Sequence, residues 1–196
     1  PTAAIRPITL DERLGRNRYA AAGPIKIGTA FIDRGRCLPW AMGRPCIVCQ
    51  ENCPVSPKAI TTKVIFPSVA AKGDLIVKFA GPAYVEFGTD LLEPDRLATG
   101  DYFCHFELES EDVMHKIVRN SARFIEIDPS PPFEAPPEAG SRVDIRIRLQ
   151  QPYVDPARCI GCGICQHECP VLGLRAIRVT AENESRTSAH RLLLTS

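Results

Sequence analysis

The sequence has 196 residues, a formal net charge of +1 and 44% hydrophobic residues, which is enough for one ordinary domain or two small ones. A net charge so close to zero gives no strong electrostatic attraction to nucleic acid, so we expect no nucleic-acid partner. No run approaches the roughly 20 apolar residues of a membrane-spanning helix, so we expect no direct membrane span. Eighteen prolines and 13 glycines indicate many turns and few long helices.

The chain begins with an N-terminal extension, residues 1–25, that contains several arginines. Asp11 and Glu12 dilute this positive charge, and no aromatic residues alternate with the arginines as they do at many nucleic-acid sites. We interpret the extension as a solvated or partner-contacting segment.

The first cysteine group follows the extension. It consists of Cys37, an eight-residue gap, and the run Cys46-Ile47-Val48-Cys49-Gln50-Glu51-Asn52-Cys53-Pro54. Such close spacing lets one loop direct several thiolates at one metal centre. A gap of eight residues is long enough to return Cys37 to the same centre. The gap contains Trp40, which either covers the site or packs as an ordinary aromatic residue.

Residues 67–149 differ in character from the cysteine groups on either side. Val143 to Leu149 alternates apolar and charged side chains, which is the period of a half-buried strand. Gly and Pro separate the strand candidates from one another. We therefore predict an inserted antiparallel β module, either a barrel or a sandwich, with strands near residues 75–79, 84–87, 102–108, 115–118, 124–127 and 143–149.

Cys104 lies in this module, apart from the other eight cysteines and next to His105. Neighbouring side chains on a strand point to opposite faces, so we expect no nucleophile–base pair here. We interpret Cys104 as a small buried hydrophobic residue. No catalytic constellation is recognisable, and we assign no catalytic residue. The module could be a docking platform for a partner or a shield over the metal site.

The second cysteine group is Cys159-Ile160-Gly161-Cys162-Gly163-Ile164-Cys165-Gln166-His167-Glu168-Cys169-Pro170. Its spacing, C-x2-C-x2-C-x3-C-P, is the run known from iron–sulfur proteins. Zinc is the alternative, but zinc sites usually pair two C-x2-C knuckles and need no Cys-Pro. A polar tail, residues 182–196, ends the chain.

The two cysteine groups belong to a repeated unit. Phe31-Ile32-Asp33 precedes Arg36-Cys37, and Tyr153-Val154-Asp155 precedes Arg158-Cys159. After the groups come Lys58-Ala59-Ile60 and Arg175-Ala176-Ile177. Each copy reads as strand, cysteine loop, short helix and strand.

This repeat resembles the bacterial-type ferredoxins with two 4Fe–4S clusters, and the arrangement is similar to polyferredoxin proteins that accompany membrane quinol dehydrogenases. The resemblance implies an α+β, pseudo-twofold ferredoxin domain in two segments, 26–66 and 150–181, around the β module at 67–149. It also implies crossed ligand sets for two clusters. Cluster one takes Cys37, Cys46, Cys49 and Cys169, and cluster two takes Cys159, Cys162, Cys165 and Cys53.

The function implied is that of an electron carrier, not an enzyme, although the chain could be a subunit of a larger oxidoreductase. The alternative is a structural or docking subunit in which the clusters mainly staple the fold. Pro1-Thr2-Ala3-Ala4-Ile5 resembles the end of the repeated unit, which predicts a longer polyferredoxin with a cluster-binding cysteine before Pro1; the alternative is chance. We expect redox proteins, upstream iron–sulfur domains or a membrane complex as partners. We expect the protein to be cytoplasmic, or membrane-associated through an N-terminal part that precedes Pro1.

Overall fold

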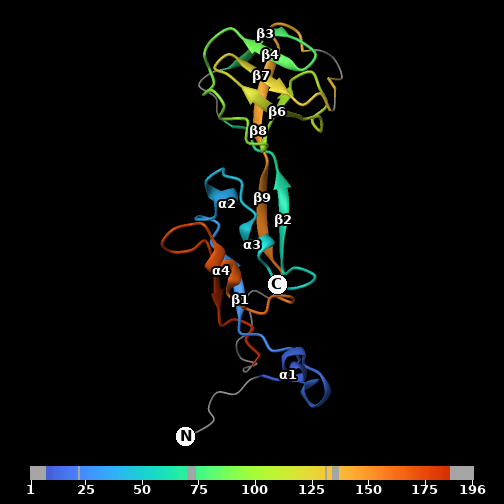
Figure 1. The fold of residues 1–196 in the computed structure, drawn as a ribbon, viewed down its shortest axis with the longest axis vertical. Helices are drawn as coiled ribbons and strands as arrows, with labels where there is room; N and C mark the ends of the chain where they lie inside the picture. The colour runs from blue at the N-terminus through green and yellow to red at the C-terminus, as the bar shows by residue number, and fades with distance from the viewer. Residues whose placement is uncertain (1–7, 22, 70–73, 131, 134–136, 186–196) are drawn as a thin grey trace. The chain divides into compact units, whose positions relative to one another are not determined.

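The computed structural model describes residues 8–21, 23–69, 74–130, 132–133 and 137–185. The chain divides into two compact units. We call the first the cysteine unit, which comprises residues 1–42, 46–63 and 151–196, and the second the barrel unit, which comprises residues 43–45 and 64–150. The chain passes from the cysteine unit to the barrel unit along strand β2 (Ile60–Ile65) and returns along β9 (Leu149–Val154) (Figure 1).

The barrel unit is a closed barrel of six antiparallel strands in the order β3-β4-β7-β6-β5-β8. Closure leaves no unpaired strand edge in the barrel. All six strands fall where strand composition predicted them, and the sequence had left the choice between barrel and sandwich open. The strands are β3 (Leu75–Ala80), β4 (Tyr84–Phe87), β5 (Tyr102–Phe106), β6 (His115–Asn120), β7 (Phe124–Ile127) and β8 (Arg142–Ile147).

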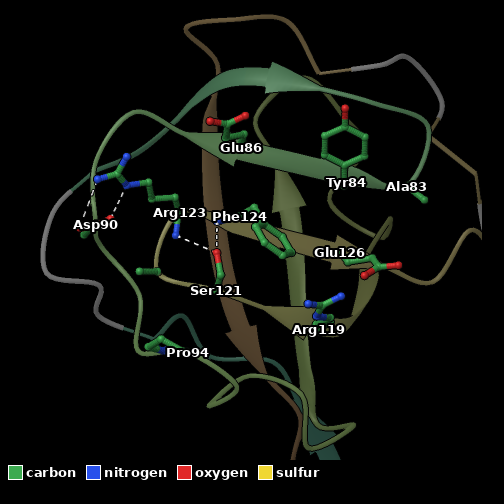
Figure 2. Close-up of a pocket in the computed structure, with 11 residues that line it drawn as sticks. Ala83, Tyr84, Glu86, Asp90, Pro94, Arg119, Ser121, Arg123, Phe124 and Glu126 are labelled. Atoms are coloured by element: carbon green, nitrogen blue, oxygen red, sulfur yellow. Dashed lines mark hydrogen bonds and ion pairs between the residues drawn. The ribbon is translucent and has the colours of Figure 1, made fainter.

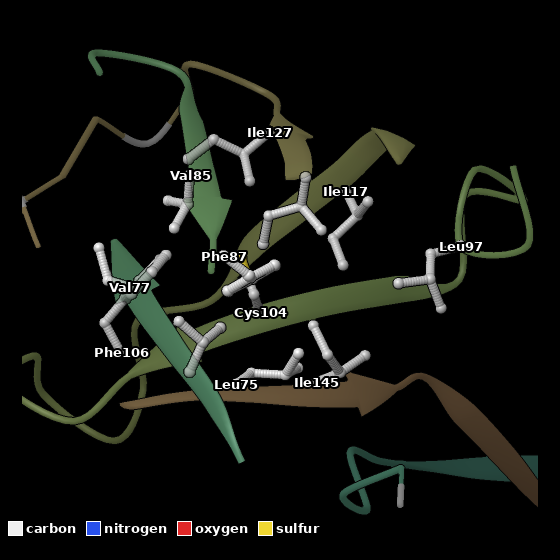
Figure 3. Close-up of a cluster of buried hydrophobic side chains, with 12 residues drawn as sticks. Leu75, Val77, Val85, Phe87, Leu97, Cys104, Phe106, Ile117, Ile127 and Ile145 are labelled. Carbon is white, nitrogen blue, oxygen red and sulfur yellow. The ribbon is translucent and has the colours of Figure 1, made fainter. Parts of the chain in front are cut away.

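Alternate side chains along these strands fill the barrel interior. In β8, for example, Val143, Ile145 and Ile147 are buried while the charged residues between them are partly exposed. Val85, Phe87 and Ile125 are almost completely buried in the same core. Figure 3 shows Val85 and Phe87 together with Cys104. The period-2 pattern of the sequence therefore sets which faces form the core.

The described part of the cysteine unit contains two small sheets and four short α-helices, three of which lie close to the cysteines. Strand β1 (Thr29–Ile32) pairs with β10 (Ile177–Thr180) in an antiparallel register that places Ile32 opposite Ile177, and β2 pairs with β9. The helices α2 (Leu38–Ala41), α3 (Val48–Glu51) and α4 (Ile164–Glu168) carry or flank the cysteines, and α3 packs against α4.

The expected fold class, an α+β pseudo-twofold ferredoxin with an inserted module, is wrong. The described residues form ten strands and four α-helices of no more than five residues each, and a closed barrel supplies six of the strands. The chain is therefore mostly β. Consecutive cysteines of a run have only two or three residues between them, which leaves room for about one helical turn. Pro54 and Pro170 then prevent the helices from continuing.

The N-terminal extension forms helix α1 (Leu10–Leu14) and a 3-10 turn at Asn17–Tyr19. Thr9 begins α1 with a capping box, since its hydroxyl accepts from the Glu12 amide while the Glu12 carboxylate accepts from the Thr9 amide. The Pro1–Ile5 segment that resembles the repeat, and the tail from residue 186 onward, lie outside the described residues.

Candidate metal centre

The first of two similar cavities in the cysteine unit is lined by Cys37, Cys46, Cys49 and Cys169. Its cavity volume is about 20 Å³. Apart from the cysteines its walls are aliphatic side chains and prolines: Ile32, Leu38, Pro39, Pro152, Pro170, Val171, Ala176 and Ile177. Four thiols thus border one small apolar space.

The second cavity is lined by Cys53, Cys159, Cys162 and Cys165 and also has a volume of about 20 Å³. Its walls are also mainly apolar. Cys162 is exposed, whereas Cys159 and Cys165 are buried. Of the nine cysteines, all of which the structure describes, Cys162 alone is classed as exposed. The second cavity therefore reaches the surface of its unit at Cys162.

The last cysteine of each run lies in the cavity of the other run. Cys169 ends helix α4 with an extended backbone (φ −58°, ψ 123°), the conformation that a following proline favours. Helix α3 likewise ends at Glu51, two residues before Cys53 and Pro54. Each Cys-Pro step thus follows the end of the short helix that holds the preceding cysteine, Cys49 in α3 and Cys165 in α4.

Burial and mutual proximity disfavour the charged form of these thiols. Burial is the main cause that raises the pKa of Cys37 to about 11, of Cys49 to about 12 and of Cys165 to about 11. Neighbouring cysteines raise these pKa values further. Cys46 and Cys169 raise the pKa of Cys37. Cys159, Cys162 and Cys53 raise that of Cys165. A bound metal centre supplies the positive charge that stabilises such thiolates.

Backbone groups approach the second cavity closely. The Ala30 amide donates a hydrogen bond to the Cys159 sulfur at 3.3 Å. Gly161 has φ +71°, and a Cβ at this position would lie 2.5 Å from the Gly28 nitrogen. The Ile27 amide also donates to the Ile160 carbonyl at 2.9 Å. The second cysteine loop therefore lies directly against the start of β1, and glycine permits this approach.

Trp40 fixes the long gap of the first cysteine group. Its indole nitrogen donates to the Pro152 carbonyl at 3.2 Å, and its ring meets Tyr153 edge-on at 5.4 Å between centroids. The Arg34 guanidinium lies 4.2 Å from the Trp40 ring centroid. Because Leu38, Pro39 and Pro152 line the first cavity, this aromatic contact holds part of its wall in place.

The residues described contain no group of three His, Cys, Asp or Glu side chains gathered closely enough for a single metal ion. The four sulfurs of each cavity surround a space instead of meeting at a point. An iron–sulfur cluster is larger than one ion and is held by four thiolates. The donor set and the apolar walls thus fit a cluster.

Residues 152–174 match the family described as "4Fe-4S binding domain". The matched 4Fe–4S stretch covers Cys159, Cys162, Cys165 and Cys169, and it indicates a 4Fe–4S cluster and an iron–sulfur electron-transfer role. No curated protein and no solved structure matches the chain. None of the helices in the described part of the chain is long and apolar enough to cross a membrane.

Cys104 lies in the core of the barrel and is completely buried, and its sulfur contacts the His115 carbonyl at 3.6 Å. Burial raises the pKa of its thiol far above the ordinary value. We expect Cys104 to react with iodoacetamide at least about 100-fold more slowly than Cys162 in the metal-free protein, because only the thiolate attacks. Mass spectrometry of alkylated peptides, with and without guanidinium, measures this. Equal rates for the two residues in the folded protein would contradict the buried placement.

A buried contact between a histidine and a glutamate in the barrel was not anticipated from the sequence. His115 is fully buried, and its Nε2 lies 2.9 Å from both carboxylate oxygens of Glu109. The His115 ring also packs against Phe106 and Phe133. Strand composition gave no signal for this pair, because Glu109 lies outside the strands and its approach to His115 depends on the path of the loop.

An open groove lies on the outer face of the barrel, where Tyr84 and Glu86 of β4 alternate with the inward-facing Val85 and Phe87 (Figure 2). Phe124 and Glu126 of β7 continue this face. The groove is bordered by an ion pair between Arg123 and Asp90. It contains aromatic and charged side chains but no cysteine. A docking role for the barrel stays a prediction.

Proposed function

We propose that this protein is an electron-transfer protein or subunit that holds two 4Fe–4S clusters with exchanged ligands. Cluster one takes Cys37, Cys46, Cys49 and Cys169, and cluster two takes Cys53, Cys159, Cys162 and Cys165. The observation that carries the proposal is the presence of two cavities of similar size, each lined by four cysteines, one of which comes from the other run. When bound, each cluster accepts and releases one electron.

In this proposal, the residues of the chain bind the clusters, exclude water from them and stabilise the negative charge of the ligand sulfurs. Four cysteines at each cavity match the full ligand number of a 4Fe–4S cluster and leave no free ligand position for a substrate. Apolar walls such as Ile32, Val171 and Ile177 keep water from the first cavity. The Ala30 amide at the Cys159 sulfur stabilises negative charge at the second.

The partners in this proposal are redox proteins, among them further iron–sulfur domains upstream in a polyferredoxin or a membrane oxidoreductase complex. Exposure of Cys162 supports contact at the second cavity, because electron transfer is favoured where a cluster ligand approaches the surface. This part of the proposal follows the sequence resemblance and the exposure of one ligand.

A structural role is the second candidate, and the composition of the unit's core favours it. Cys37, Cys159, Cys165 and Cys169 make up much of the buried core, and the remainder consists of Ala and Ile residues. So small an apolar core gains stability from a metal staple. Reversible reduction with the fold intact separates the electron-transfer role from a purely structural one.

The proposal is tested by anaerobic reconstitution, followed by metal and sulfide analysis and a redox titration monitored by EPR. We expect about eight iron atoms per chain and two one-electron steps. Stoichiometric zinc in place of iron, or about four iron atoms with a single step, would contradict it. Clusters that cannot be reduced without loss of the fold would favour the structural role.

A further inference from the structure

Arg175 makes a direct contact with a cysteine of the first cavity. Its Nη1 donates to the backbone carbonyl of Cys169 at 2.6 Å and to that of Val171 at 2.9 Å. Both acceptor residues line the first cavity. One guanidinium nitrogen therefore ties together the backbone on both sides of Pro170, at the step where Cys169 turns away from its own run.

Among the described residues, the partners of the Arg175 guanidinium are neutral backbone carbonyls. Within the part of the chain that the structure describes, no carboxylate lies within ion-pair distance of its guanidinium. The residue is partly buried, which limits screening of its charge by water. A second guanidinium acts on the same loop, since Arg36 Nε donates to the Leu174 carbonyl at 2.8 Å.

The corresponding basic residue of the other repeat lies in a different environment. Lys58 precedes Ala59-Ile60 as Arg175 precedes Ala176-Ile177. The Lys58 ammonium donates to the carbonyls of Gln50 and Glu51, each at 2.7 Å, and its side chain is exposed. The second cavity thus lacks an equivalent contact to Cys53, and water screens the Lys58 charge.

A similar difference separates the arginines that precede each cysteine group. Arg158, next to Cys159, forms an ion pair with Asp155 at 3.2 Å. Arg36, next to Cys37, donates instead to a backbone carbonyl. The arginines beside Cys37 and Cys159 therefore differ, because Arg36 bonds a neutral carbonyl whereas Asp155 neutralises Arg158.

We propose that Arg175 is a positioning residue that fixes Cys169 at the first cavity and raises the reduction potential of the cluster held there. The inference rests on the proposed function, because it assumes that Cys169 is a ligand of that cluster. Reduction adds one negative charge, and a fixed cation close to a ligand stabilises the reduced form. The hydrogen bonds of Arg175 hold this charge at a constant place relative to Cys169.

The test compares Arg175→Met, Arg175→Gln and Arg175→Lys with Lys58→Met in the reconstituted full chain. A redox titration followed by EPR gives the potential of each cluster, and Cys162→Ser assigns the two steps because it changes the ligand of cluster two. We expect Arg175→Met and Arg175→Gln to lower the equilibrium constant for reduction of cluster one about tenfold. This equals a decrease of about 59 mV in its one-electron reduction potential. Arg175→Lys keeps the positive charge and most of the wild-type potential. Lys58→Met changes the equilibrium constant for reduction of either cluster by less than about threefold.

Two further results decide the positioning role. Iron release from cluster one to a chelator becomes faster in Arg175→Met and stays near the wild-type rate in Arg175→Lys. Complete loss of cluster one in Arg175→Met with retention in Arg175→Lys also supports the inference. An unchanged potential in Arg175→Met with both clusters bound would overturn it, as would an equal decrease in Arg175→Lys. Wild-type protein without two one-electron steps would refute the proposed function itself, whatever the variants show.

Discussion

Replacing Cys169 by alanine is expected to remove the cluster of the first cavity and to leave that of the second, so that iron falls from about eight to about four atoms per chain. Cys169 belongs by sequence to the second run but lines the cavity of Cys37, Cys46 and Cys49. A cluster with three thiolates and an open iron in a small cavity loses iron readily. Iron analysis and EPR of the reduced variant measure the loss.

Paired substitutions distinguish exchanged from unexchanged ligands. With exchanged ligands, Cys46→Ala/Cys169→Ala removes two ligands of one cluster and retains about four iron atoms, whereas Cys46→Ala/Cys162→Ala damages both clusters and retains about none. If each run held its own cluster, both double variants would lose all iron. Cys104→Ala, which changes a cysteine in the barrel core, is the matched control and should keep about eight iron atoms.

Spacing alone leads to a set of candidate ligands, because the chemistry of a cluster constrains local sequence. The C-x2-C-x2-C run and the two Cys-Pro steps are short-range patterns, and the cysteines they mark do border two cavities. Strand positions were also local: β4 and β7 have the bounds that their composition predicted. The cysteine spacing and the strand positions can both be predicted because each depends on residues that are close together in the sequence.

The fold class failed because it depends on how elements combine. Nothing in Val143–Leu149 specifies that β8 pairs with both β3 and β5, the pairing that closes the barrel. The contact between Arg175 and the Cys169 carbonyl was missed for a similar reason, since the sequence shows only a basic residue before Ala-Ile. The buried pair of Glu109 and His115 likewise requires the loop between β5 and β6, which carries Glu109, to fold back toward His115. Such contacts arise from tertiary structure.

Substitution of Phe87 by alanine should destabilise the barrel by about 3–5 kcal/mol, the usual cost of removing a buried phenylalanine from a core. Phe87 is only 1% exposed and lies in the same buried cluster as Val77 and Val85 in the barrel interior (Figure 3). The matched control is Phe79→Ala, because Phe79 belongs to the same barrel but is 54% exposed. We expect that control to cost less than about 1 kcal/mol.

The two units should respond separately to Phe87→Ala, because each has a hydrophobic core of its own. Hydrogen exchange measured by mass spectrometry reports on β4 and β7 of the barrel. The fluorescence of Trp40, the one tryptophan of the chain, reports on the cysteine unit, where its ring packs against Tyr153. We expect faster exchange in the barrel strands, an unchanged Trp40 transition and full iron content. A parallel loss of iron and an earlier Trp40 transition would instead show that the clusters depend on an intact barrel, so that the two units unfold as one cooperative structure.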